Sequence, residues 1–435
     1  MKGAVMKITD IIRSLREDRF ANIFRELYGN SEKALKYQKE RYIKAAERFS
    51  ELYPERTDVR IFSAPGRTEI GGNHTDHQHG CVLAAAVNLD AVAVVAFHND
   101  GVIRVKSEGY EKFKVSLGEL SPKKYEKGSP AIVRGVAARF ASMGAKIGGF
   151  DMYSTSDVLT GSGVSSSAAF ETLIGTIIDT YYNESRAGAV EIAKIGQYAE
   201  NVYFGKNSGL MDQMVSSVGG LVGIDFRDTE DPEIRSFKCD FEEYGYCLCI
   251  TDTKGSHADL TPDYDAVRSE MEEIAGYFGK PYLRETDEEE FFKALPAIRK
   301  KCSDRSILRA MHFFSDNRRA VLEANALRDG NMEYFLALVR ESGDSSANYL
   351  QNLYSCSKPL NQEIPLAIAL SKKVLGGSGA VRVHGGGFAG TIQAFVPLEK
   401  ADEYINEMNR IFGENSCQKM RIRPYGGIEI TKEVF

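Results

Sequence analysis

The residues of this chain that could do chemistry are concentrated in one short run, Asp157–Glu171, which reads DVLTGSGVSSSAAFE. Two glycines and three consecutive serines stand there, directly before apolar residues spaced as one face of a helix: Phe170, Leu173, Ile174, Ile177, Ile178 and Tyr181. The first N–H groups of a helix lack intrahelical partners, and its macrodipole is positive at that end. The run therefore predicts a phosphate site, with a nucleoside triphosphate as the natural ligand.

Two commoner phosphate motifs do not explain this run. A Walker loop needs Lys followed by Ser or Thr after its second glycine, whereas a valine follows Gly163. The dinucleotide pattern G-x-G-x-x-G occurs at Gly385, Gly387 and Gly390, but the next residues, TIQAFV, predict a strand where that fold needs a helix. A helix cap with a small-residue packing contact is the remaining alternative to phosphate binding.

The elements that must position this run alternate irregularly between helix and strand. Apolar residues at helical spacing cover 6–52, and strand patterns begin at Val59. Later patterns predict helices and strands at 129–143, 149–156, 189–204, 246–253, 263–331, 332–349 and 379–396. This order predicts an α+β protein of two domains, 1–222 and 223–435, divided near the turn GGLVGIDFRD.

Composition excludes several kinds of partner. A net charge of −6 and a pI near 5.8, without a clustered basic surface, argue against nucleic acid. The longest apolar run, 82–97, is too short and too polar to span a membrane, and the N-terminus lacks the apolar core of a signal peptide. Seven cysteines without a C-x-x-C pair fit reduced thiols, so we expect a cytoplasmic protein. The oligomeric state is open, with a monomer as one option.

Three segments in order along the chain resemble the three motifs of the GHMP small-molecule kinases. They read SAPGRTEIGGNHTDHQHG at 63–80, LTGSGVSSSAA at 159–169 and VRVHGGGFAGTIQAF at 381–395. The first is similar to the galactokinase signature. Two further segments resemble the catalytic and sugar-binding parts of galactokinases: SGLMDQ at 208–213 and DTKGSHADLTPDYDAVRSEM at 252–271. Five such segments in the family's order identify the chain as galactokinase-like.

The resemblance implies a GHMP kinase architecture, with a mixed α/β N-terminal domain of ribosomal-protein type, a ferredoxin-like C-terminal domain and a cleft active site. It implies transfer of the γ-phosphoryl group of ATP to the anomeric 1-hydroxyl of galactose or a close relative, with Mg2+. Asp212 would accept the hydroxyl proton, and Arg67 would stabilise both that carboxylate and the phosphoryl group. Glu200 and Ser167, with Ser166 as the alternative, match the magnesium ligands.

The other residues carried over from the family would bind the two substrates. The ATP-binding loop comprises Gly161, Ser162, Gly163, Val164, Ser165, Ser166, Ser167 and Ala168. The second domain would support this loop through Gly385, Gly386 and Gly387. The sugar site comprises Arg67, Asn73, His74, Asp76, Gly209, Asp212 and Tyr264. Because each sugar hydroxyl can donate and accept, carboxylates and imidazoles in a fixed pocket would distinguish epimers.

The first motif departs from the galactokinase pattern G-R-x-N-x-I-G-E-H-x-D-Y at four positions: Glu69, Gly71, Asn73 and His77. Asn73 replaces a glutamate that is expected to bond the C6 hydroxyl, and a neutral amide no longer repels an anion. The segment H-x-D-H-Q-x-G also resembles galacturonokinases. We therefore hypothesise that Asn73, with His77, relaxes or shifts selectivity at C6. The alternatives to a galactokinase are a galacturonokinase and a non-catalytic galactose- and ATP-binding regulator.

Overall fold

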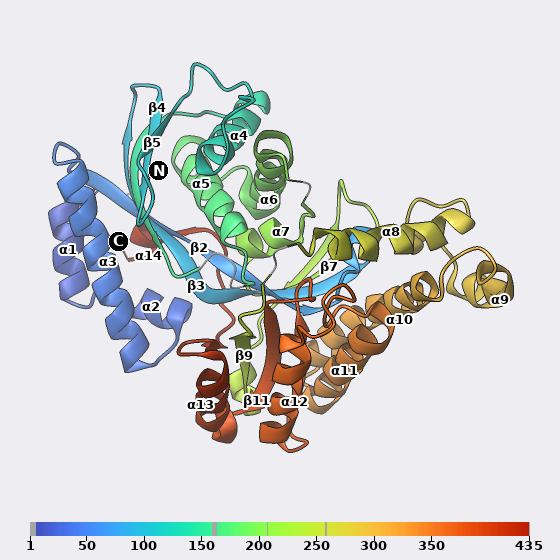
Figure 1. Ribbon diagram of the computed structural model, residues 1–435. Coiled ribbons are helices and arrows are strands. Elements are labelled where there is room, and N and C mark those ends of the chain that lie inside the picture. Colours follow the sequence, from blue (N-terminus) through green and yellow to red (C-terminus); the bar gives the residue numbers. More distant parts are fainter. Residues whose placement is uncertain (1–5, 159–162, 207, 257–258, 435) are drawn as a thin grey trace.

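The computed structural model describes residues 6–158, 163–206, 208–256 and 259–434 and contains two β-sheets with helices around them (Figure 1). The nine-stranded sheet comprises β1 Met6–Lys7, β2 Asp58–Gly71, β3 Cys81–His98, β4 Val102–Ser107, β5 Phe113–Ser116, β6 Gly149–Ser156, β7 Leu221–Asp225, β8 Glu233–Phe237 and β13 Ile428–Glu429. The four-stranded sheet comprises β9 Tyr246–Asp252, β10 Ala380–His384, β11 Thr391–Pro397 and β12 Cys417–Met420.

The helices cover both faces of the larger sheet and the outside of the smaller one. They are α1 Ile8–Arg16, α2 Ala21–Tyr28, α3 Glu32–Leu52, α4 Ser129–Ser142, α5 Ser166–Asn183, α6 Gly188–Tyr198, α7 Met211–Val218, α8 Thr261–Tyr277, α9 Glu288–Ile298, α10 Asp304–Arg328, α11 Met332–Ser345, α12 Glu363–Leu375, α13 Ala401–Phe412 and α14 Ile430–Val434. The described helices include no candidate for a membrane-spanning segment.

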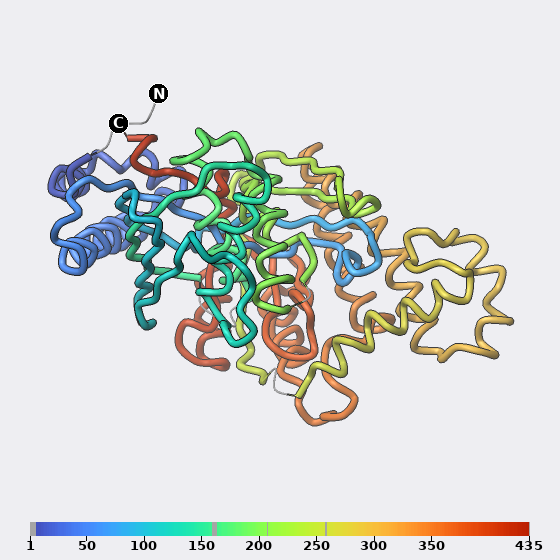
Figure 2. The backbone as a smooth tube through the Cα atoms, turned by 90° about the horizontal axis from the view of Figure 1, so that it is seen from above, coloured from blue at the N-terminus to red at the C-terminus, as the bar shows by residue number. Residues whose placement is uncertain are grey.

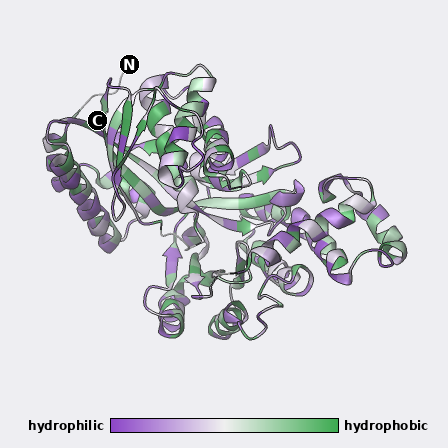
Figure 3. Ribbon diagram, turned by 45° about the horizontal axis from the view of Figure 1, so that its top comes forward, coloured by the Kyte–Doolittle hydropathy of each residue, from purple (hydrophilic) through white to green (hydrophobic). Residues whose placement is uncertain are grey.

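The long antiparallel strands β2 and β3 form the buried centre of the larger sheet. Successive side chains of a strand point to opposite faces. On β3, Ala93 and Val95 join the core that contains α4 and α5, whereas Val92 and Val94 pack against α1–α3. These N-terminal helices, at the left of Figure 3, contain many hydrophilic residues. Because both faces are covered, β2 carries the first motif on a rigid support.

The smaller sheet carries the third motif and lies against the larger one (Figure 1). Strands β10 and β11 are antiparallel neighbours joined by the glycine-rich loop 385–390. Gln393 of β11 donates a hydrogen bond to the carbonyl of Ile70 on β2 at 3.0 Å, and His384 of β10 bonds the Thr68 hydroxyl at 2.9 Å. These contacts between the two sheets fix the third motif next to the first.

Helices α8 and α9 and the N-terminal part of α10 form a helical lobe that projects away from both sheets, whereas the C-terminal part of α10 packs on the larger sheet (Figures 1 and 2). Its own apolar cluster includes Val267 of α8, Phe291 of α9 and Phe313 of α10. Only the start of α8 reaches the glycine loop, where the Tyr264 hydroxyl donates to the carbonyl of Gly387 at 3.0 Å. Helix α10 also contacts the first motif, because Asp316 accepts a hydrogen bond from the Asn73 backbone N–H at 2.7 Å and His312 Nε2 lies 2.9 Å from the Asn73 carbonyl.

The α+β prediction, the helical N-terminal segment and the glycine-rich strand pair are confirmed. The helix expected over 263–331 is instead three helices, because Gly279 at φ +68° and the following Pro281 end α8, and the Ser303 side chain caps α10. Helix α12 was not predicted. The division into 1–222 and 223–435 stays a prediction: β7 spans this boundary, and β8 and β13 also belong to the first sheet.

Candidate active site

A cavity of about 230 Å³ lies where the first motif, the SGLMDQ segment and the glycine loop meet. Its walls come from β2 and the short helix η1 (Asp76–Gln78), from the approach to α7, and from the loop after β10. The lining residues are Arg67, Glu69, His74, Asp76, His77, Lys206, Ser208, Gly209, Met211, Asp212, Gly385 and Gly386. A larger cavity of about 420 Å³, between β8 and α10, contains none of the predicted site residues.

Arg67 and Asp212 form the ionic centre of this cavity. Nε and Nη2 of Arg67 donate to the two carboxylate oxygens of Asp212, each at 2.7 Å, and Ser165 Oγ donates to Oδ2 at 2.7 Å. Asp212 lies in the first turn of α7, where the helix dipole favours a negative charge. Burial raises the pKa of Asp212, but Arg67 outweighs this effect and holds the pKa below its usual range. The carboxylate is therefore ionised and able to accept a proton.

The serine-rich run begins beside this ion pair. Arg67 Nη1 donates to the carbonyl of Gly163 at 2.7 Å, and the Arg67 backbone N–H donates to the next carbonyl along the loop at 3.0 Å. Gly163 has φ +76°, and a Cβ there would come within 2.8 Å of Thr391 Oγ1 on β11. The loop is thus held between the two sheets at a position that favours glycine. Gly161 and Ser162, also expected in the ATP-binding loop, lie outside the described residues.

Helix α5 starts with its N-terminus free of a side-chain cap. The residue at the cap position is Ser165, but its hydroxyl donates to Asp212 and makes no capping bond. The helix N–H groups and the partly exposed Ser166 and Ser167 are therefore available for phosphate oxygens. Two loop residues have buried side chains and can reach a ligand only through the backbone: Val164 and Ala168.

A pair of buried carboxylates, Glu171 and Glu200, lies next to the start of α5. Gln213 Nε2 donates to one oxygen of each at 2.9 Å, and Lys206 Nζ pairs with the other oxygen of Glu200 at 3.0 Å. Glu171 follows Ser167 by four residues, so both lie on one helix face. Burial and the charge of Glu200 raise the pKa of Glu171 well above its usual value. Two neighbouring carboxylates beside a hydroxyl form a hard-oxygen donor set that fits a divalent cation.

These oxygens would be only part of a metal shell. Within the described ranges, no group of three or more His, Cys, Asp or Glu side chains could hold a metal ion. Magnesium in kinases is typically held by one or two protein oxygens, with phosphate oxygens and waters completing the octahedron. The donor set around Glu200 is therefore suited to an ion that arrives with a nucleotide.

The opposite wall of the cavity offers hydrogen-bonding groups to a sugar. Burial and the neighbouring His77 lower the pKa of His74 to about 4, so its ring is neutral. His74 Nε2 lies 2.8 Å from the carbonyl of Gly386, which can only accept, so Nδ1 remains an acceptor. Asp76 lies beside Gly209, where a Cβ would come within 3.1 Å of its Oδ2. His74, Asp76 and Gly209 all line the cavity, and their contact with a sugar stays a prediction.

Two residues expected to bind the sugar do not line the cavity. Asn73 is completely buried, and its amide nitrogen donates to Glu69 Oε1 at 3.0 Å and to the carbonyl of Gly385 at 2.7 Å. Tyr264 packs behind the glycine loop and donates to the carbonyl of Gly387. A direct sugar contact is therefore not supported for Asn73 or Tyr264, because other residues separate both side chains from the cavity.

Sequence analysis missed four residues of this site. Glu69 was noted only as a departure from the family pattern, although it lines the cavity. Glu171 and Gln213 were not considered, although Glu171 follows Ser167 at the helical spacing of four and Gln213 adjoins Asp212. Lys206 follows directly after the glycine that ends the helical segment, and nothing in the sequence indicated that it would turn back to Glu200.

Comparisons with known proteins agree with this geometry. A family model of the galactokinase galactose-binding signature matches residues 47–97, and a model of the GHMP kinase N-terminal domain matches residues 131–220. A galactokinase from Actinobacillus pleuropneumoniae serotype 5b (strain L20) is 31% identical over 375 residues, which are 85% of this chain and 92% of that protein. The chain belongs to the galactokinase family. It is an ATP-dependent sugar kinase of the GHMP type.

Solved structures show the same fold. The galactokinase of Lactococcus lactis, determined in complex with galactose, matches with a TM-score of 0.75 and 23% identity over 88% of this chain and 98% of that chain. The mevalonate kinase of Methanococcus jannaschii matches with a TM-score of 0.54 and 16% identity over 83% of this chain and 98% of that chain. The predicted GHMP kinase architecture is thereby confirmed.

Proposed function

We propose that this protein transfers the γ-phosphoryl group of ATP to the anomeric hydroxyl of galactose and forms galactose 1-phosphate. The observation that carries the proposal is the bidentate ion pair of Arg67 with Asp212, in which each hydrogen bond is 2.7 Å long. This pair lies between the cavity and the start of α5. Phosphoryl transfer depends mainly on positioning and on neutralising charge. A base, a fixed cation and an anion-binding helix end around one cavity supply both.

In this proposal Asp212 accepts the proton of the anomeric hydroxyl while that oxygen forms a bond to the γ-phosphorus. The bond between the γ-phosphorus and the bridging oxygen breaks, and ADP leaves with that oxygen. Arg67 keeps Asp212 ionised before the step and offsets charge on the phosphoryl oxygens during it. The Ser165 hydroxyl, which donates to Asp212 at 2.7 Å, orients the carboxylate.

We propose that ATP binds with its phosphates at the N-terminus of α5, where the uncapped N–H groups and the hydroxyls of Ser166 and Ser167 lie. Glu200 and Ser167, with Ser166 as the alternative, would hold Mg2+. The bound ion would neutralise charge on the β- and γ-phosphates. Glu200 is held in place by Gln213, which donates to it at 2.9 Å.

We also propose a cytoplasmic location, supported by seven cysteines that form no disulfide.

The two alternatives fit the site less well. A galacturonate would bring a further carboxylate into a cavity that already contains those of Glu69, Asp76 and Asp212. A non-catalytic regulator would not need the paired Arg67 and Asp212 beside an uncapped helix end. An assay that couples ADP release to a sugar panel tests the proposal directly. Turnover of galactose is the expected result; binding of galactose and ATP without turnover of any sugar would support the regulator instead.

A further inference from the structure

The side chain that stands where the sugar's selectivity could be set is Glu69, not Asn73. Glu69 lies on β2 two residues after Arg67, and both residues line the cavity. Only 6% of Glu69 is exposed, and what is exposed faces the cavity. Since strand residues two apart point to the same face, the side chains of Glu69 and of Arg67, which pairs with Asp212, lie on the same face of β2.

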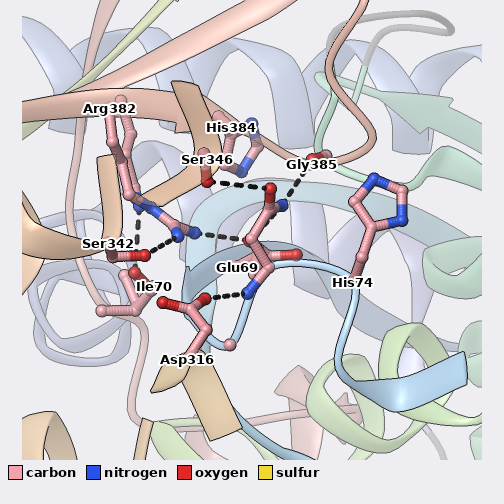
Figure 4. Close-up of polar contacts among 12 residues, drawn as sticks. Glu69, Ile70, His74, Asp316, Ser342, Ser346, Arg382, His384 and Gly385 are labelled. Atoms are coloured by element: carbon pink, nitrogen blue, oxygen red, sulfur yellow. Dashed lines mark hydrogen bonds and ion pairs between the residues drawn. The ribbon is translucent and has the colours of Figure 1, made fainter. Parts of the chain in front are cut away.

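The Glu69 carboxylate is fixed through one oxygen. Oε1 accepts from Arg382 Nη2 at 2.5 Å and from Asn73 Nδ2 at 3.0 Å, and the fully buried Arg382 is fixed in turn by the Ser342 hydroxyl at 2.8 Å (Figure 4). Oε2 receives no hydrogen bond from the described part of the chain. Burial raises the pKa of Glu69 above its usual value, although Arg382 and Asn73 oppose this shift. A rigid carboxylate therefore keeps one oxygen free to accept a hydrogen bond in the cavity.

Asn73 has no capacity left for a ligand. Its amide nitrogen donates both hydrogens, to Glu69 Oε1 and to the carbonyl of Gly385. Its Oδ1 accepts from Asn352 Nδ2 at 2.9 Å and from Ser346 Oγ at 3.3 Å. An amide with both donors and both acceptor positions used acts as a support for Glu69 and not as a sugar contact.

We propose that Glu69 is the specificity-determining residue of the sugar site, where its free oxygen accepts a hydrogen bond from a hydroxyl of a neutral hexose and repels a sugar that carries a carboxylate. The inference rests on the proposed galactose kinase function and extends it to the substrate class. The galactokinase pattern has an asparagine at the position of Glu69 and a glutamate at the position of Asn73. This chain has the two residue types exchanged, so that the carboxylate lies at position 69 and the amide at position 73 supports it.

The test compares galactose with galacturonate as substrates for the full-length parent protein and for Glu69→Gln. The glutamine keeps the shape and an acceptor for Arg382 but loses the charge. We expect kcat/KM for galactose to fall by about 10- to 100-fold, as for loss of one hydrogen bond to a charged group. Because the repulsion is also lost, the galactose to galacturonate ratio of kcat/KM should fall with it. Glu289→Gln, on the exposed side of α9, is the matched control and should leave the ratio unchanged.

A Glu69→Gln ratio equal to that of the parent would overturn the proposal, as would a parent that prefers galacturonate. Glu69→Asp tests the same idea if the glutamine variant does not fold, because the shorter side chain retains the charge. It should bind galactose more weakly but still reject galacturonate, and loss of that rejection would contradict the proposal. A parent that turns over neither sugar would instead refute the proposed function itself, so the two failures are distinguishable.

Discussion

Replacing Arg67 with lysine separates the geometry of its ion pair with Asp212, which we propose to be catalytic, from the charge of that pair. The guanidinium makes three hydrogen bonds at 2.7 Å, two to the oxygens of Asp212 and one to the carbonyl of Gly163. A lysine ammonium is a point charge on a flexible stem and cannot reproduce this planar fork. We expect it to keep one of the three contacts.

The magnitude follows from the contacts that are lost. Hydrogen bonds to charged groups contribute about 1.5–3 kcal/mol each. We take the lower value, since 29% of the Asp212 side chain is exposed to solvent. Two lost bonds then cost about 3 kcal/mol, which corresponds to roughly a 100-fold decrease in kcat/KM for galactose. Steady-state kinetics at saturating ATP would measure this decrease.

The pH profile provides an independent readout of the same change. In the parent, Arg67 holds the pKa of Asp212 below its usual range, so the base is ionised down to acidic pH. A lysine at this position stabilises the carboxylate less, so the pKa rises and the acidic limb of kcat/KM moves to higher pH. Arg186→Lys, at an exposed surface ion pair, is the control and should change neither quantity. Unchanged kcat/KM and an unmoved acidic limb in Arg67→Lys would refute the role assigned to the bidentate contact of the Arg67 guanidinium with Asp212.

Three further predictions follow from the site and the core. Asp212→Asn should abolish most of kcat but leave galactose affinity by calorimetry nearly intact, because the amide keeps the shape and loses the base; near-normal kcat would contradict this. Gly163→Ala should raise the KM for ATP by roughly 10-fold or more, because of the left-handed φ and the close contact with Thr391, whereas Gly101→Ala, strained but with open space, should not. Glu323 is a completely buried residue of α10, and Glu323→Gln should raise the free energy of unfolding at pH 8 but not at pH 4, measured with urea. Burial raises the pKa of Glu323 well above its usual value, although Arg382 opposes this shift. The parent therefore loses stability as the pH rises from 4 to 8, because the buried carboxyl resists ionisation in the folded state. An equal effect of the substitution at pH 4 and at pH 8 would contradict the reasoning.

Much of this site could be predicted from the sequence because its parts are contiguous. The glycine and serine run ahead of α5 is itself enough to predict a helix start, and the N–H groups at a helix start favour anions. The Arg67, His74, Asp76 and Asp212 assignments came from short segments with a family pattern, and the structure places all four on one cavity. Features of this kind depend on residues close together in the sequence, so they can be predicted without knowledge of the fold.

The assignments at Asn73 and Glu69 could not be reached in this way. Whether Asn73 or Glu69 faces the cavity depends on Arg382, Ser346 and Asn352, which lie more than 270 positions away along the chain. Position in the motif suggested that Asn73 takes the place of a sugar-binding glutamate, but the distant donors and acceptors saturate its amide and turn it inward. Side-chain direction was settled by these long-range partners.

The sequence by itself determined the α+β class and was enough to predict the phosphate site at the start of α5 and the roles of Asp212 and Arg67, because each of these depends on local periodicity or on a short motif. Only the tertiary structure decided which distant side chains lie together. Gln213 donates hydrogen bonds to both Glu171 and Glu200 and so links the two carboxylates. Position 71 must be a glycine, because a Cβ there would come within 1.6 Å of Glu323 Oε2. The physical reason is that hydrogen bonds and steric contacts act over a few ångströms in space, whatever the separation along the chain.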